Sequence, residues 1–236
     1  MALDVYVGSL TRYYAGEWEN VAEKTARERG APYRIARPGG SPDRLRDAQT
    51  IQPAIEAWRR ALSDSLGGNI ARPLDWDETL EAPYFTGRPG WDGFGSLVLW
   101  AAYAEHPALH QPAVLAEEWD NDPALLRSNA AGFRSRYSHL VRNVELWLPS
   151  PFEFTFEGED VDGRRVVVGS SMMLRRQLDE LNAATWKASA TAVGQWSREP
   201  PPEDAAAELC ARFAFALLLD LSRAAVERKL AMTLDY

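Results

Sequence analysis

The stretch FEFTFEGEDVDGRRVVV, residues 152–168, decides the fold class. Its three phenylalanines alternate with Glu153 and Thr155, which places the rings on one face of a strand. Asp162–Gly163 is a typical turn pair, and residues 165–168 supply an apolar return strand. We therefore expect an antiparallel hairpin within a chain whose other patterns are mostly helical.

Helical periodicity dominates the chain outside this hairpin. A first strand is expected at 3–9 and a second at 33–37, followed by a loop at 38–42. Helices are expected over a segment ending near 30 and over 51–66, 96–105, 126–146, 170–181, 185–196 and 203–230. The fold class is thus α+β, mostly helical, with a small antiparallel sheet that includes the hairpin near 152–168.

One domain over residues 1–236 is expected, and Pro149 and Pro151 leave open a weak subdivision near 148–151.

The formal net charge of −8 argues against nucleic acid and anionic membranes as partners. The single cysteine, Cys210, excludes an internal disulfide and is expected to be buried. With no secretory signal and no apolar run of membrane-spanning length, we expect a cytoplasmic protein. No cofactor is indicated.

Residues 74–105 contain seven aromatic side chains, six carboxylates and one cation, Arg88. Asp75, Trp76, Asp77 and Glu78 form the first candidate binding site in this stretch. In extended backbone the two aspartates share one side, opposite Trp76. Paired carboxylates bind basic groups or cations, and glycosidases combine them with aromatic platforms. A solvated loop is the alternative.

Trp91 and Asp92 form the second candidate, within PGWDGFG at 89–95. Its glycines permit tight turns, but the lysine and Ser/Thr spacing of a phosphate loop is absent. We expect irregular backbone, with either a binding role or a loop anchored on the core by Trp91 and Phe94.

Arg12 and Tyr14 form the third candidate, directly after the first strand. Arg12 at this position can face a pocket for an anionic ligand. The alternative is an ion pair between Arg12 and Glu17 or Glu19.

Neither a metal site nor a catalytic set is predicted. His106 and His110 are four residues apart, but Pro107 breaks the helix on which they would share a face. Ser170 lacks the second flanking glycine of a nucleophile elbow and is expected to cap a helix.

Four blocks of the chain resemble a group of bacterial proteins with no assigned activity. They are LDVYVGSLTRYYAGEWE (3–19), LDWDETLEAPYF (74–85), WDGFGSLVLWAAY (91–103) and LPSPFEFTFEGEDVDGRRVVVGSS (148–171). The abundance of arginine over lysine is also typical of GC-rich bacterial genomes. The resemblance implies a free-standing bacterial domain and transfers no site residues.

The leading hypothesis is a bacterial cytoplasmic interaction protein of the immunity or inhibitor type. It would bind a basic protein partner through the acidic aromatic loop, with Trp76 and Trp91 as anchors. Asp75, Asp77 and Asp92 would supply the complementary charge.

The alternative is a small-molecule (sugar-type) binding protein or a hydrolase that uses the same loop as a pocket, with Asp77 or Glu78 as acid or base. A third interpretation makes the aromatic residues ordinary core. The lack of a catalytic set favours a binding protein over an enzyme.

Overall fold

The computed structural model describes residues 3–32 and 47–236, so the strand expected at 33–37 and the loop at 38–42 lie outside the described residues. Within these ranges, six strands form one sheet in the order β2-β1-β6-β3-β5-β4. The strands are β1 (Asp4–Gly8), β2 (Phe85–Gly87), β3 (Val144–Leu148), β4 (Phe156–Glu159), β5 (Arg165–Ser170) and β6 (Ala231–Asp235). The β3–β5 pair is parallel and the other neighbours are antiparallel. The α+β class is confirmed, but the sheet is mixed and larger than the small antiparallel sheet expected.

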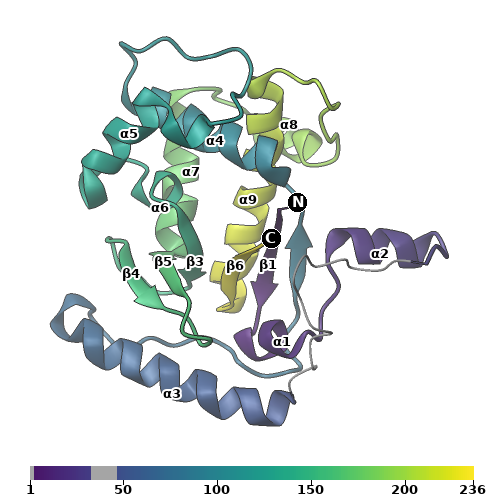
Figure 1. Cartoon of the computed structure of the whole chain (residues 1–236), viewed down its shortest axis with the longest axis vertical. Helices are drawn as coiled ribbons and strands as arrows, with labels where there is room; N and C mark the ends of the chain where they lie inside the picture. Colours follow the sequence, from purple (N-terminus) through teal and green to yellow (C-terminus); the bar gives the residue numbers. More distant parts are fainter. Residues whose placement is uncertain (1–2, 33–46) are drawn as a thin grey trace.

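Helices pack on both faces of this sheet (Figure 1). One side carries α4 (Gly90–Glu105), α5 (Pro123–Ala130), α6 (Ser138–Val141), α7 (Ser171–Ala184), α8 (Ala190–Trp196) and α9 (Ala207–Arg228). The other side carries α1 (Leu10–Ala15) and α3 (Ala48–Leu66), while α2 (Val21–Glu28) projects sideways and buries none of its residues. Short 3-10 turns, η1 (Gly67–Asn69), η2 (Trp119–Asn121) and η3 (Gly132–Arg134), complete the described elements.

The sheet separates two apolar cores, because successive side chains of a strand point to opposite faces. Val5 and Trp147 contribute to the core beneath α4, α7 and α9. Leu148 and Val168 contribute to the core beneath α1 and α3. Strands on either side of residues 148–151 belong to the same sheet.

The hairpin is confirmed at its turn and corrected at its first strand. Gly163 has a left-handed φ of 78°, as a tight turn requires, and β4 pairs with β5. However, β4 begins only at Phe156, so Phe152 precedes the strand although its ring is buried against the α3 side.

The prediction of one long helix at 126–146 is wrong. This segment contains α5, η3, α6 and the start of β3. Gly132 and Asn143 both adopt positive φ, at 63° and 51°, and such residues interrupt a right-handed helix. Val144 fits the apolar face of a helix by spacing, yet it begins a central strand.

Further elements differ from expectation at their bounds, among them α8, which begins at Ala190 rather than near 185. Helix α4 begins at Gly90, so the segment 89–95 expected to be irregular is largely helical. Its glycines allow close packing: a Cβ on Gly93 would lie 3.4 Å from Cβ of Ala214, and one on Gly95 would lie 2.7 Å from the Trp119 ring. The last helix ends at Arg228, and the chain then forms β6, a strand that the pattern did not predict.

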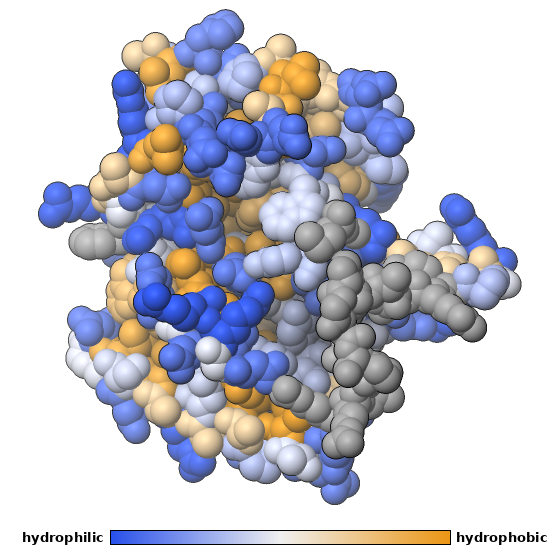
Figure 2. Space-filling model, in the orientation of Figure 1, coloured by the Kyte–Doolittle hydropathy of each residue, from blue (hydrophilic) through white to orange (hydrophobic). Residues whose placement is uncertain are grey.

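Among the described residues no helix combines the length and the apolar character needed to cross a bilayer. The face drawn in Figure 2 shows hydrophobic residues as separate patches between polar ones. Cys210 is buried, as expected.

The junction of β5 and α7 supplies a test of this packing. A Cβ on Gly169 would lie 2.9 Å from Nδ1 of His139 and 2.9 Å from Cγ1 of Val144, both in a fully buried region. Gly169→Ala should therefore lower the free energy of unfolding by about 1–3 kcal/mol in urea denaturation.

Gly194→Ala is the matched control, because a Cβ at this helical position meets nothing within 4 Å. It should raise the free energy of unfolding by about 0.5–1 kcal/mol. Equal stabilities for the two variants would contradict the packing described at Gly169.

Candidate functional site

Two residues of the first candidate site, Trp76 and Glu78, lie in the core. Their exposed fractions are 3% and 5%. The Glu78 carboxylate accepts hydrogen bonds from the backbone N–H of Leu10 (3.2 Å), from the backbone N–H and hydroxyl of Thr11 (2.8 and 2.9 Å) and from the Trp76 indole. The backbone donors belong to the first turn of α1, which has no intrahelical acceptors for them. Glu78 therefore fixes its own loop to α1.

Burial raises the pKa of Glu78, while the donors from Thr11, Trp76 and Leu10 act in the opposite direction. Glu78 resembles a catalytic acid only in that its pKa is raised. Its surroundings are nevertheless closed by four donors, so no substrate atom can reach it without unfolding this contact. Burial removes Trp76 and Glu78 from the set of surface anchors.

Asp75 and Asp77 lie at the surface but have local partners. Asp75 is exposed, and its carboxylate lies 3.9 Å from the Arg59 guanidinium. Asp77 accepts hydrogen bonds from the Thr79 backbone N–H (2.9 Å) and hydroxyl (2.7 Å), which stabilises the turn.

Arg12 and Tyr14 also have structural partners. The Arg12 guanidinium donates to the carbonyl oxygens of Ala82 (2.6 Å) and Leu80, and lies over the Tyr84 ring at 5.2 Å. It thus holds the 80–84 segment to α1 and makes no ion pair with Glu17 or Glu19. Tyr14 is half-buried against the α3-side core, and burial raises its pKa.

Of the two predicted aromatic anchors, Trp91 lines a surface cavity. We call this cavity of about 360 Å³ the acidic pocket. It is formed by four segments of the chain, with the lining residues Trp91, Phe94, Glu117, Trp119, Asp120, Asn143, Val144, Glu145, Leu234 and Tyr236. Asp92, next to Trp91 in the first turn of α4, is exposed but is not among these residues.

The pocket has an apolar floor and aromatic walls. Phe94, Val144 and Leu234 are at most 5% exposed and form its base. The Trp91 ring meets the Tyr236 ring edge-on with centroids 5.2 Å apart. The Trp119 ring is packed against Gly95 of α4, which brings the 106–122 loop back over the helix.

Three carboxylates lie around this cavity, and the described lining contains neither lysine nor arginine. Glu145 is already engaged: it accepts from the Tyr236 hydroxyl (2.8 Å) and lies 3.3 Å from the Arg164 guanidinium. Glu117 and Asp120 are exposed, and in the described part of the chain their side chains make no hydrogen bond or ion pair. Their charges are available to a ligand.

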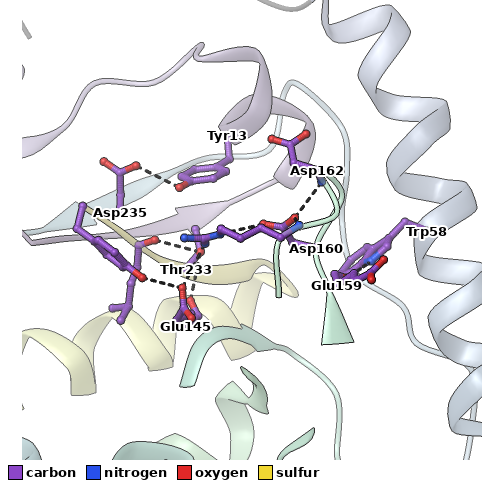
Figure 3. Close-up of polar contacts among 11 residues, drawn as sticks. Tyr13, Trp58, Glu145, Glu159, Asp160, Asp162, Thr233 and Asp235 are labelled. Atoms are coloured by element: carbon purple, nitrogen blue, oxygen red, sulfur yellow. Dashed lines mark hydrogen bonds and ion pairs between the residues drawn. The ribbon is translucent and has the colours of Figure 1, made fainter. Parts of the chain in front are cut away.

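Glu145 also belongs to a polar network on the neighbouring sheet surface (Figure 3). In this network Arg164 lies 3.4 Å from Asp160, and beside the network Tyr13 donates to Asp235 at 3.1 Å. Thr233 donates to the backbone carbonyl of Glu145 at 3.2 Å. The Thr233 hydrogen bond and the ion pair with Arg164, which Asp160 also holds, fix the Glu145 wall of the acidic pocket.

Most of the lining residues escape prediction from the sequence. Glu117, Trp119 and Asp120 lie in EEWDN at 117–121, a mixture of acid and aromatic residues like the one at 75–78. This local signal is available from the sequence, whereas the approach of Tyr236 and Glu145 depends on strand pairing between β6 and β3.

The histidines form no metal centre. Within residues 3–32 and 47–236, no group of three or more His, Cys, Asp or Glu side chains could hold a metal ion. His139 is fully buried, and its Nδ1 accepts from the Ser170 backbone N–H at 2.9 Å. Ser170 caps α7, as expected, by accepting from the Met173 backbone N–H.

Comparison with protein-family models, with curated proteins and with solved structures finds no match to this chain. Its site must therefore be interpreted from its own residues.

The Glu78 contact gives a stability prediction. Glu78→Gln places an amide N–H₂ among donors, so at least one buried donor loses its acceptor. The free energy of unfolding should fall by about 2–4 kcal/mol in urea denaturation. Glu81→Gln, at an exposed position three residues later, should change it by less than about 0.5 kcal/mol. Equal changes in the free energy of unfolding for the two variants would show that the four-donor contact of Glu78 does not stabilise the fold.

His139 predicts a loss of stability in acid. Burial, followed by the charge of Arg176, lowers the pKa of His139 to about 4. Since this value is below that of the unfolded chain, the His139 contribution is complete above pH ~6.5 and falls as the pH drops toward 4. Protonation should cost about 2–3 kcal/mol of unfolding free energy by pH ~4.5.

Urea denaturation at neutral pH and at acid pH measures this cost. His139→Asn keeps an acceptor without a titrating group, so its stability should fall less between the two conditions than that of the unmodified protein. His110→Gln, at an exposed position, should retain the full decrease. Identical decreases for both variants would contradict the assignment to His139.

Proposed function

We propose that this protein is a bacterial cytoplasmic interaction protein that binds a basic protein partner. The acidic pocket receives a cationic side chain of that partner. One observation carries the proposal: Glu117 and Asp120 are unpaired carboxylates at a cavity walled by Trp91, Trp119 and Tyr236. Aromatic anchors beside charged groups are typical of interface hot spots.

The chemistry of the pocket suits an arginine or lysine side chain. An aromatic face attracts a cation by about 0.5–2 kcal/mol, depending on how far both are removed from water. Each carboxylate adds roughly 1–4 kcal/mol of Coulomb attraction at contact distance near a protein surface, before desolvation is subtracted. The apolar floor accommodates the methylene groups that such side chains bury.

The charge of the whole chain supports the same kind of partner. A formal net charge of −8 speeds encounter with a basic surface and disfavours acidic ones. Asp92, exposed beside Trp91, extends the negative charge beyond the pocket. An immunity or inhibitor-type protein acts in this manner, by covering a basic surface of its partner.

A hydrolase is less well supported. That function needs a carboxylate of raised pKa in a cleft, together with the aromatic platform. Glu78 has a raised pKa, but it is buried beneath α1 and does not line the acidic pocket. The observations therefore favour binding over catalysis.

A labelled octa-arginine peptide tests the proposal by fluorescence anisotropy. The unmodified protein should bind it saturably. Glu117→Gln combined with Asp120→Asn should raise the Kd about tenfold, because both unpaired charges of the pocket are lost.

Asp179→Asn combined with Glu227→Gln is the control, since it removes two exposed and unpaired carboxylates from α7 and α9. It should change the Kd by less than about twofold, because the screening length is near 8 Å at physiological salt. Equal weakening by both pairs would mean that only the net charge matters, and would refute a site at the pocket.

A further inference from the structure

A second cavity of about 510 Å³ is lined by residues at the end of α3 and just after it. Figure 1 shows this end of α3 well away from the start of α4. Its lining includes three arginines, Arg59, Arg60 and Arg72, although the chain as a whole is acidic. We call it the basic recess. It shares no lining residue with the acidic pocket.

The walls of the basic recess are fixed by hydrogen bonds. The Ser63 hydroxyl donates to the carbonyl of Arg59 (2.9 Å) and accepts from the backbone N–H of Leu74 (3.0 Å). Ser63 thus ties the 70–74 segment back to α3. The recess is therefore formed before any ligand arrives, which lowers the ordering cost of binding.

Arg59 is held in place on one wall. Its Nη1 donates to the carbonyl of Trp76 at 2.8 Å, and its guanidinium lies over the Trp76 ring at 5.2 Å. Trp76 is itself buried, so it gives the Arg59 guanidinium a rigid support. A guanidinium has five N–H donors, and the bond to Trp76 uses one of them.

Arg60 and Arg72 are exposed and unpaired. In the described part of the chain their side chains make no hydrogen bond, ion pair or ring contact. Two carboxylates, Asp64 and Asp75, also line the recess, so its formal charge is about +1. Asp75 offsets part of the Arg59 charge, which leaves Arg60 and Arg72 as the groups free to bind an anion.

We propose that the basic recess binds the phosphate group of a small phosphorylated molecule. Guanidinium groups pair with phosphate oxygens through two parallel hydrogen bonds, and are favoured for that reason at phosphate sites. Ile70, Pro73 and Leu74 provide an apolar side for the organic part of the molecule. The volume is within the range of small-molecule sites.

The free molecule, rather than a phospholipid headgroup, is the ligand that the charge favours. A chain of net charge −8 is repelled from an anionic bilayer, where many phosphates act together. A single phosphate inside the recess is instead attracted mainly by the nearby arginines. Charges beyond about 8 Å are screened at physiological salt.

Calorimetric titration with glycerol 3-phosphate at constant ionic strength tests this site. The unmodified protein should bind saturably. Arg60→Gln combined with Arg72→Gln should weaken binding about tenfold, because both free guanidinium groups are lost. Arg198→Gln combined with Arg228→Gln removes two exposed, unpaired arginines elsewhere and should change the Kd by less than about twofold.

Asp75→Asn should have the opposite effect on the affinity for glycerol 3-phosphate. It removes a carboxylate that repels the phosphate, so the affinity should rise about two- to fivefold. No binding by the unmodified protein, or equal loss in both arginine pairs, would overturn the proposal. Cosedimentation with phosphatidate vesicles without binding of glycerol 3-phosphate would overturn the assignment to a free molecule. Octa-arginine binding should be unchanged in the Arg60/Arg72 variant. The proposals for the basic recess and for the acidic pocket are therefore tested independently.

Discussion

Strand β6 (Ala231–Asp235) holds the two halves of the described sheet together. It pairs with β1 on one edge and with β3 on the other, and the described strands contain no second link between β2-β1 and β3-β5-β4. Its side chains also divide between the cores: Met232 packs beneath α9, and Ala231 faces the α3 side. Both cores therefore meet at this strand, and its pairing joins the parts of the sheet on which their helices pack.

The same strand places one wall of the acidic pocket. Leu234 and Tyr236 lie at its end, and the Tyr236 hydroxyl reaches Glu145 of β3. The opposite wall depends on packing between helix and loop, since the missing side chain of Gly95 makes room for the Trp119 ring. The pocket is therefore a consequence of tertiary packing, and its charge comes from Glu117 and Asp120, which the fold leaves unpaired.

Local patterns predict the parts of this fold that local forces determine. The turn at Asp162–Gly163, the amphipathic α3 and the Ser170 cap are of this kind. The helix expected at 126–146 is wrong because strand pairing of Val144–Leu148 overrides its helical spacing. The site follows the same division: no local pattern distinguishes Trp91, which lines the pocket, from Trp76 and Glu78, which are buried by α1 and α3. Tyr236 reaches the pocket only through the pairing of β6, which no local pattern indicates.

The central claim is that a cationic side chain enters the acidic pocket. The indole N–H signals in a ¹⁵N-correlated NMR spectrum report on this directly, with Trp91→Phe and Trp119→Phe used for assignment. Titration with an arginine-rich peptide should shift the signals of Trp91 and Trp119 saturably and leave that of the buried Trp147 unchanged. Shifts confined to other tryptophans, such as Trp58 on α3, or shifts that never saturate, would contradict the account.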